Sequence, residues 1–416
     1  MSGRVSTTDT TLVIRHIPDS DPASFQVVRL RDAKTSEPVR PPSPHGFPVE
    51  GRPNSDLVRE LQWYLEAFLD YPFPPETDHA DRVLKALKDW GEQTFEALFG
   101  NRSAGRMFEA ATADDYSELR LQISSDDARV LAWPWEALRD PELGVLAHLC
   151  QIERRLNKVR DPQPLSASLP NDQVNILLVV ARPYGERDVG FRSIARPLVE
   201  LIEKEKLPAY VELLRPPTFD QLREHLRERP GFYHILHFDG HGAYSAEAHG
   251  TAEYTFQGPE GKLVFETENG QPDPITAEKL TALLKEHAVP GVVLNACQSA
   301  MVGEGADDPF SSVAAALLRS GMRSVVAMAY SLYVSGAQQF LPPFYRRLFE
   351  EGSMAGALRA GRQQMFRQDK RVCVRGKFPL QDWLLPVLYQ QDPLNFSFAA
   401  EARKTFVPQL QSSRRS

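Results

Sequence analysis

Cysteine is scarce in this sequence. Only three of the 416 residues are cysteines: Cys150, Cys297 and Cys373. They are too few and too widely separated to form the disulfide framework that holds small secreted domains together. So few cysteines fit a reducing compartment, and we expect the protein to be cytoplasmic.

Long apolar runs are missing as well. No stretch approaches the roughly 18 consecutive apolar residues that a membrane-spanning helix needs. The first residues, Met1–Thr11, are polar and lack the apolar core of a signal peptide. We therefore expect no membrane partner.

The sequence has no surplus of positive charge. Lys and Arg number 48 against 55 Asp and Glu, which gives a net charge of −7. Proteins that bind nucleic acids need a basic surface, so direct nucleic-acid binding is not expected. Hydrophobic residues make up 42% and charged residues 25%, as in ordinary globular proteins. The length allows two or three domains.

Sequence motifs for cofactors and metals are also absent. There is no P-loop, no HExxH pattern and no second cysteine near Cys297. His234, His237 and His241 cluster in the sequence, but His234 and His237 are three apart in an expected strand and so point to opposite faces. We therefore predict neither a metal nor a cofactor.

The first part of the chain predicts a mixture of strands and helices. The expected strands are Thr11–Ile17, Ser24–Leu30, Leu119–Ile123, Val130–Trp133 and Ile152–Leu156, the first two forming a pair. The expected helices are Asp56–Leu69, Ala80–Phe99 and the short Pro134–Leu138. A Pro- and Ser-rich stretch, Arg160–Gln173, has the composition of a linker.

After this linker, strands alternate with helices. The expected strands are Val174–Ala181, Tyr210–Leu214, Phe232–Phe238, Val289–Leu294 and Ser324–Ala329, with a hairpin over Tyr254–Glu266. The expected helices are Ile194–Lys206, Thr218–Arg229, Thr276–His287, Pro309–Gly321, Gln338–Glu351 and Met354–Arg367. This alternation predicts an α/β fold whose mostly parallel sheet is flanked by helices.

The sequence thus predicts four parts. Residues 1–110 form a smaller α+β accessory region, and 111–160 a connecting segment with strands. Residues 161–395 form the α/β core, and 396–416 a polar, flexible tail.

Two neighbouring strands of the expected sheet are followed by reactive residues. Phe232–Phe238 precedes Asp239-Gly240-His241-Gly242, and Val289–Leu294 precedes Asn295-Ala296-Cys297. Reactive groups of α/β proteins gather beyond the carboxyl ends of parallel strands. A lone cysteine is most often a buried core residue. Paired with a histidine at the adjacent strand end, Cys297 is instead expected to be a nucleophile and His241 its base.

This pair suits acyl transfer. A free thiol is only a few per cent ionised at neutral pH, and a neighbouring imidazole can take its proton. The oxyanion then needs donors in place, and we expect them to be the backbone N–H groups of Gly242 and Cys297. Asp239 is interpreted as a turn-forming residue. No third residue that orients His241 can be identified.

Two motifs carry a family resemblance. HFDGHG at His237–Gly242 and LNACQSA at Leu294–Ala300 resemble the signatures of CHAT domains, a bacterial branch of the caspase-like, clan CD cysteine peptidases related to separase. LAWPWEALRD at Leu131–Asp140 is similar to the family's segment ahead of the core, and the likeness covers about residues 110–392. It implies a caspase-like fold, His241 as base and Cys297 as nucleophile.

One position departs from the relatives. Related peptidases that cut after Arg or Lys often carry an acidic residue two positions before the nucleophile, where this sequence has Asn295. A basic preference at the cleavage site therefore does not transfer. Asn295 and Asp239 are the candidate substrate-binding residues.

The resemblance also implies a role. Such proteins resemble components of bacterial stress, cell-death or phage-defence systems, in which proteolysis is triggered on demand. The first 110 residues show no 34-residue repeat, so a sensing function would belong to a regulatory protein partner or to the N-terminal region. Two alternatives remain: a silent interaction module that keeps the fold, and a thioester or acyl hydrolase that uses the same pair.

Overall fold

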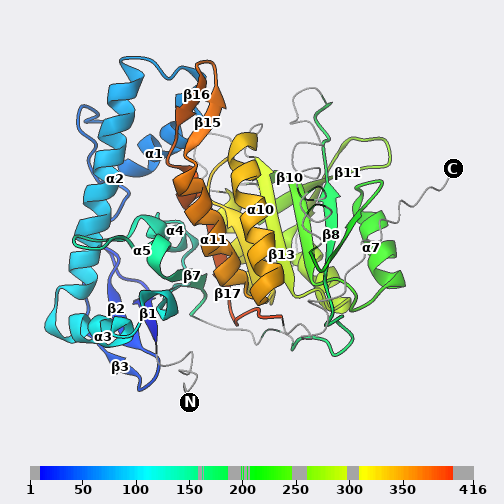
Figure 1. Cartoon of the computed structure of the whole chain (residues 1–416), viewed down its shortest axis with the longest axis horizontal. Helices are drawn as coiled ribbons and strands as arrows, with labels where there is room; N and C mark the ends of the chain where they lie inside the picture. Colours follow the sequence, from blue (N-terminus) through cyan, green and yellow to red (C-terminus); the bar gives the residue numbers. More distant parts are fainter. Residues whose placement is uncertain are drawn as a thin grey trace, which may run out of the picture. The chain divides into compact units, whose positions relative to one another are not determined.

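The computed structural model describes residues 10–157, 162, 164–185, 198, 200, 204, 207–245, 260–297 and 309–396 (Figure 1). At positions 243–245, 260, 296–297 and 309–312 it describes the backbone alone. The chain divides into two compact units. Unit 1 consists of Met1–Lys158 with Arg362–Leu388, and unit 2 of Val159–Gly361 with Tyr389–Ser416.

Unit 1 contains a sheet in the order β7-β4-β1-β2-β3. Its strands are β1 (Thr11–His16), β2 (Phe25–Arg29), β3 (Lys34–Thr35), β4 (Arg120–Ser124) and β7 (Gln151–Arg155). β1 pairs antiparallel with β2, as the sequence predicts, and parallel with β4, which in turn pairs parallel with β7. The apolar side chains of β1, β2, β4 and β7 are buried, so this sheet lies in the core of the unit.

Three longer helices accompany this sheet: α1 (Leu57–Glu66), α2 (Glu76–Phe99) and α3 (Arg102–Thr112). The Asp56 side chain caps α1 by accepting from the Arg59 N–H, and Asn101 caps α3 in the same way. The smaller elements are η1 (Phe68–Asp70), η2 (Tyr116–Glu118), α4 (Ala128–Leu131), η3 (Trp135–Ala137), β5 (Arg139–Asp140), β6 (Gly144–Val145), α5 (Leu146–Leu149), β15 (Lys370–Cys373), β16 (Gly376–Pro379) and η5 (Asp382–Leu384).

The expected strand Val130–Trp133 is wrong. The chain forms the short helix α4 there, capped by the Asp127 side chain, which accepts from the Arg129 N–H. Trp133 stacks on Trp135 with ring centroids 5.3 Å apart, and the Trp135 indole donates to the Val130 carbonyl. The Asp127 cap and these contacts of the two indoles therefore decide the conformation of a run too short for its periodicity to be informative.

Unit 2 contains five parallel strands in the order β9-β8-β10-β13-β14. They are β8 (Val174–Val180), β9 (Ala209–Leu213), β10 (Ile235–Ser245), β13 (Gly291–Cys297) and β14 (Ser324–Met328). The hairpin of β11 (Glu260–Glu266) and β12 (Pro272–Thr276) pairs antiparallel with the last part of β10. The predicted fold class, a mostly parallel sheet flanked by helices, is confirmed.

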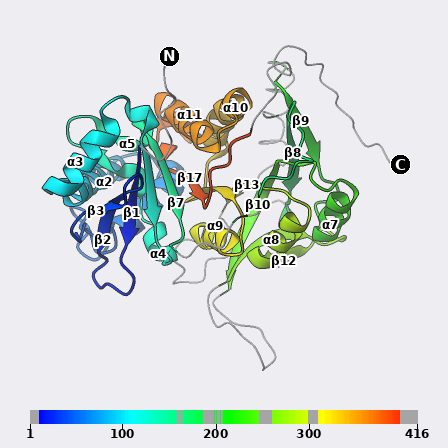
Figure 2. The same ribbon diagram turned by 90° about the horizontal axis from the view of Figure 1, so that it is seen from below.

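Helices cover both faces of this sheet. They are α7 (Phe219–Glu228), α8 (Ala277–Glu286), α9 (Pro309–Arg319), α10 (Val334–Glu351) and the first part of α11 (Met354–Arg367). Figure 2 shows α10 on one side of β10 and β13, and α8 and α9 on the other. The Thr218 and Thr276 side chains cap α7 and α8. The expected helix Ile194–Lys206 lies almost wholly outside the described residues.

Two expectations about β10 and its neighbours need correction. The strand does not end at Phe238 but runs on to Ser245, because β11 supplies a ladder partner from His241 onward. Asp239 is therefore a strand residue and not a turn residue. The expected hairpin over Tyr254–Glu266 begins outside the described residues, and its described part, Glu260–Glu266, is the single strand β11, which pairs with β10 and β12.

The chain passes from unit 1 to unit 2 within β17 (Pro386–Gln390). Among the helices of the described ranges, none is long and apolar enough to cross a membrane.

Candidate active site

The parallel pairing of β10 with β13 fixes the centre of the site. His241 is the register partner of Cys297, and Asp239 is the partner of Asn295. Cys297 is the last residue of β13, whereas β10 continues for four residues beyond His241. The two residues that the sequence singled out thus lie side by side in the backbone ladder, at the carboxyl end of β13.

His241 is nearly buried, with 6% of its surface exposed. The ring of Tyr184, in the segment that follows β8, meets the imidazole edge-on, with centroids 4.9 Å apart and planes at 78°. Edge-to-face contacts of this kind restrict the orientation of both rings. Tyr184 therefore holds the His241 ring from the β8 side.

Asp239 is the centre of a polar cluster two residues before His241 in β10. One carboxylate oxygen, Oδ2, accepts from Arg182 Nη2 at 2.7 Å, and the other, Oδ1, accepts from Asn295 Nδ2 at 3.1 Å. Arg182 Nη1 also donates to the Asp239 carbonyl at 2.8 Å. Asp239 and Asn295 are 3% and 6% exposed. Burial raises the pKa of Asp239, against the opposing effect of the Arg182 guanidinium.

A second pair of charges lies next to this cluster. The Arg182 backbone N–H donates to Glu266 Oε1 at 2.6 Å, and Arg215 Nη1 donates to the Val180 carbonyl at 3.1 Å. Burial lowers the pKa of Arg215; attraction to Glu266 opposes this, and repulsion by Arg182 adds to it. Two cations, Arg182 and Arg215, and two carboxylates, Asp239 and Glu266, therefore lie together at this end of the sheet.

Gly242 continues β10 and is the register partner of Leu263 in β11. Its N–H and that of Cys297 stay the predicted oxyanion donors. The preceding Gly240 has a packing reason: an added Cβ would lie 2.8 Å from the Phe238 ring. Glycine at this position lets β10 pass its own neighbouring aromatic ring.

His234, His237 and His241 cluster in the sequence, but each contacts different residues in the structure. His234 precedes β10, where its Nδ1 accepts from the Asn175 N–H and its Nε2 lies 2.9 Å from the Pro170 carbonyl. His237 Nδ1 lies 2.7 Å from the Tyr345 hydroxyl of α10, and burial lowers the pKa of His237 to about 3. Within the described ranges, no group of three or more His, Cys, Asp or Glu converges as metal ligands would.

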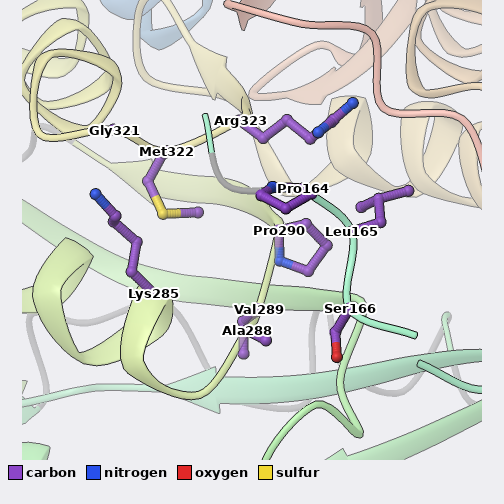
Figure 3. Close-up of a pocket in the computed structure, with 10 residues that line it drawn as sticks. All are labelled: Pro164, Leu165, Ser166, Lys285, Ala288, Val289, Pro290, Gly321, Met322 and Arg323. Atoms are coloured by element: carbon purple, nitrogen blue, oxygen red, sulfur yellow. The ribbon is translucent and has the colours of Figure 1, made fainter. Parts of the chain in front are cut away.

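A small cavity lies at the opposite end of the strands. Figure 3 shows it between the residues that precede β13 and β14, among them Pro290, Met322 and Arg323, with Lys285 of α8 at its side. Its volume is about 20 Å³, room for about one water molecule. It lies at the amino ends of the strands, so it belongs to packing and not to the His241–Cys297 region.

Sequence reasoning missed two residues of this region, Arg182 and Tyr184. Both follow β8, the strand next to β10, and the rule that reactive groups follow parallel strands would have marked this segment. Nothing in the sequence indicates that the guanidinium turns back to Asp239.

Of three comparisons with known proteins, one identifies a family. A family model described as CHAT domain matches residues 82–402. No curated protein matches the sequence. Two crystal structures of the Saccharomyces cerevisiae separase–securin complex are similar in fold, with TM-scores of 0.47 and 0.41 at 10% and 11% sequence identity. In both cases the match covers 94% of this chain and 30% of the other, so this chain spans less than a third of that length.

Proposed function

Because the chain belongs to the CHAT domain family, as the match over most of its length shows, we propose that it is a cysteine endopeptidase with His241 as base and Cys297 as nucleophile. The observation that carries this proposal is the ladder register, in which His241 and Cys297 are direct partners in neighbouring strands. Neighbouring strands lie about 4.8 Å apart, so a thiol and an imidazole at these two positions are within reach of one another.

The proposed reaction proceeds in two halves. In the first, the Cys297 thiol gives its proton to the His241 imidazole, and the thiolate attacks the carbonyl carbon of the scissile peptide bond. The tetrahedral oxyanion is stabilised by the backbone N–H groups of Gly242 and Cys297. The C–N bond then breaks, and the His241 imidazolium protonates the leaving amine.

In the second half, water hydrolyses the resulting thioester. His241 takes a proton from the attacking water, a second oxyanion forms in the same place, and the C–S bond breaks to release the carboxylate product. The thiolate recovers a proton from His241. No cofactor enters either half.

The environment of the pair supports a polypeptide substrate without a basic residue at the cut. Asn295 stands two positions before Cys297, and the nearby Asp239 carboxylate is already paired with Arg182. A substrate cation would have to compete with this internal guanidinium. We propose that the residue preceding the scissile bond is not basic.

The proposal includes regulation. As a CHAT family member, the protein would be activated on demand by a regulatory protein partner in a bacterial stress, cell-death or phage-defence pathway. The family match is the support for this part.

Peptide products test the proposed activity. The wild-type protein and the Cys297→Ala variant are each incubated with a proteome digest, with and without candidate partner proteins, and new peptide ends are determined by mass spectrometry. The activated wild type is expected to produce new ends after a consistent residue, and the variant none under either condition. Cys373→Ser, which changes a half-exposed thiol of unit 1, is the matched control and should retain cleavage.

The same experiment separates the alternatives. Ends that persist in Cys297→Ala would reject the assignment of the nucleophile. A protein that releases only small acids from thioesters, and no peptides, would be an acyl hydrolase. A protein that does neither, with Cys297 no more reactive than in His241→Ala, would be an interaction module.

A further inference from the structure

The polar cluster of Arg182, Asp239 and Asn295 comes from three neighbouring strands of unit 2. Asp239 lies in β10, Asn295 in β13, and Arg182 directly follows the segment of β8. Asp239 receives one hydrogen bond from each neighbour, at 2.7 Å from Arg182 and at 3.1 Å from Asn295. One carboxylate thus joins the strands on both sides of β10.

The cluster lies two residues before the proposed catalytic pair along β10 and β13. Asp239 and Asn295 are register partners, and the next partners of the same parity are His241 and Cys297. Two residues of strand span about 6.6 Å, so the joined side chains lie about that far before the proposed catalytic pair. Whatever fixes the spacing of β10 and β13 at Asp239 also fixes it at His241.

Stability alone does not account for a polar trio in this place. Its side chains are almost buried, with exposures of 14% for Arg182 and 4% for Asp239. Taking an ion pair out of water costs free energy, and well-packed apolar residues of similar size are often equally or more stabilising. The remaining contribution of such a cluster is geometric, because hydrogen bonds fix direction and distance in a way that apolar contacts do not.

Arg182 makes further hydrogen bonds to the backbone and to β11. Its Nη1 donates to the carbonyl oxygens of both Asp239 and Ala181, each at 2.8 Å. The Arg182 N–H donates to Glu266 of β11. The residue two positions later, Tyr184, contacts the His241 ring. One short segment therefore holds the Asp239 backbone, the Asp239 carboxylate and the imidazole.

We propose that Arg182, Asp239 and Asn295 form a clamp, a set of positioning residues that holds the β10 and β13 ends at the spacing in which His241 can take the Cys297 proton. This inference rests on the proposed function. The clamp does not contact the reacting atoms; it acts through the two strands.

The test measures the chemistry of Cys297 without any substrate. Iodoacetamide alkylates thiolates, so the dependence of its rate on pH reports the ionisation of Cys297. The protein carries Cys373→Ser, and Cys150 is fully buried, so the alkylation signal comes from Cys297. Peptide mapping by mass spectrometry confirms the alkylated residue.

The expected result is a graded series. In the reference protein the half-maximal rate should lie well below pH 8.5, the value for a free thiol, and in His241→Ala it should move up by about one pH unit or more. Asn295→Leu and Arg182→Met should move it in the same direction while their thermal midpoints stay within a few degrees of the reference. Arg182→Lys keeps the cation but lacks the planar fork that donates to the Asp239 carboxylate and carbonyl, so it should shift the profile less than Arg182→Met without restoring it fully.

Two different failures are distinguishable. If His241→Ala has the reference profile, the proposed catalytic pair itself is wrong. If His241→Ala shifts the profile but folded Asn295→Leu and Arg182→Met do not, the pair stands and the clamp is overturned. Should Asn295→Leu fail to fold, folded Arg182→Met decides alone, because Arg182 is the most exposed member of the cluster. A reference profile in Arg182→Met would then overturn the clamp.

Discussion

At the scale of single residues, unit 1 contains a buried carboxylate between two guanidinium groups. Glu136 Oε1 accepts from Arg154 Nη1 at 2.6 Å and from Arg362 Nη2 at 2.8 Å, while Oε2 accepts from Arg154 Nη2 at 2.7 Å. All three side chains are at most 2% exposed. Burial by itself would raise the pKa of Glu136, but Arg154 and Arg362 outweigh it and hold the pKa below its ordinary value.

We expect Glu136→Gln to lower the free energy of unfolding by about 3–5 kcal/mol, because it leaves two buried cations without their anion. A carboxyl whose folded pKa is depressed stabilises the protein above its ordinary pKa and loses this contribution as the pH falls through the folded value. The difference between wild type and variant should therefore be full at pH 7 and shrink below about pH 4.5.

Urea unfolding at pH 7 and below about pH 4.5 measures the difference in stability between wild type and Glu136→Gln. The exposed Glu142 provides the matched control, and Glu142→Gln should cost less than about 0.5 kcal/mol. A Glu136→Gln protein as stable as the control at pH 7 would contradict the argument.

His148 also makes the protein less stable in acid, but because burial excludes its charged form and not because a charged pair is lost. It packs between Phe366 and Trp383, with ring centroids 4.4 Å from each, and neither ring nitrogen has a hydrogen-bond partner in the described part of the chain. Burial, together with repulsion from Arg362, lowers the pKa of His148 to about 4. The folded state therefore binds this proton less readily than the unfolded state, and stability falls as the pH drops from about 6.5 toward 4.

We expect His148→Phe to remove this acid sensitivity. The variant should be about as stable as wild type at pH 7 and more stable at pH 4.5, since phenylalanine fills the site without a proton to exclude. Thermal unfolding between pH 7 and pH 4.5 tests it, with the exposed His45→Phe as control. Parallel curves for wild type and His148→Phe would refute it.

At the scale of elements, the sequence predicts helices well where the apolar pattern is long or a capping side chain precedes the helix. Met354–Arg367 was predicted with the bounds of α11, and Thr218 and Thr276 cap the helices that were expected after them. The helix α3 and the β15–β16 hairpin were not predicted, and Val130–Trp133 was assigned to the wrong class. Val130–Trp133 and the β15–β16 hairpin are too short for their periodicity to be informative, whereas α3 has 11 residues and an explicit Asn101 cap and is an exception to this rule.

In the candidate site, too, the sequence singles out some residues and misses others. His241 and Cys297 follow strands and stand in distinctive motifs, so the sequence could name them. Arg182 and Tyr184 become visible only when β8 is placed beside β10, and the pairing of Asp239 with Arg182 requires the fold. Their residue types carry no signal of their own.

Replacing either of two glycines of α11 by alanine is expected to change the free energy of unfolding, in opposite directions at the two positions. An added Cβ at Gly361 would lie 2.4 Å from the Phe340 ring of α10, whereas at Gly356 the nearest atom is the flexible end of Glu351 at 3.2 Å. Alanine is favoured over glycine within helices by about 1 kcal/mol. Gly356→Ala should therefore raise the free energy of unfolding, and Gly361→Ala should lower it by about 1–3 kcal/mol through overpacking.

Chemical denaturation of the two variants measures both changes. Truncating the ring in Gly361→Ala/Phe340→Leu should restore part of the loss relative to Phe340→Leu alone. A stabilised Gly361→Ala would show that α10 and α11 can separate at no cost.

At the scale of the whole molecule, unit 1 is built from two segments that are far apart in the sequence. Arg362–Leu388 returns to Met1–Lys158 and supplies core residues such as Leu380 and Trp383. The Gln381 N–H donates to the Tyr64 hydroxyl at 2.9 Å, and Arg375 Nη1 donates to the Pro72 carbonyl at 2.9 Å. The rhythm of strands and helices contains no sign of this return.

A fragment of residues 1–158 should therefore not fold on its own. It lacks Arg362 beside Glu136 and loses the apolar cover that the second segment provides, which removes more than the few kcal/mol by which domains are stable. Far-ultraviolet circular dichroism and a thermal scan test this expectation, with full-length Cys297→Ala as reference. A cooperative transition of the fragment near that of the full chain would disprove it.

The turn between α10 and α11 has a practical consequence for spectroscopy. Gly352 adopts φ +75°, where an added Cβ would lie 2.0 Å from the Phe396 carbonyl, and the Phe396 N–H donates to the Gly352 carbonyl at 2.7 Å. This contact anchors the end of the described chain to unit 2, whereas the exposed Lys377 belongs to unit 1. Spin labels at Asn395 and Lys377, only 18 positions apart in the sequence, would thus report on one unit each.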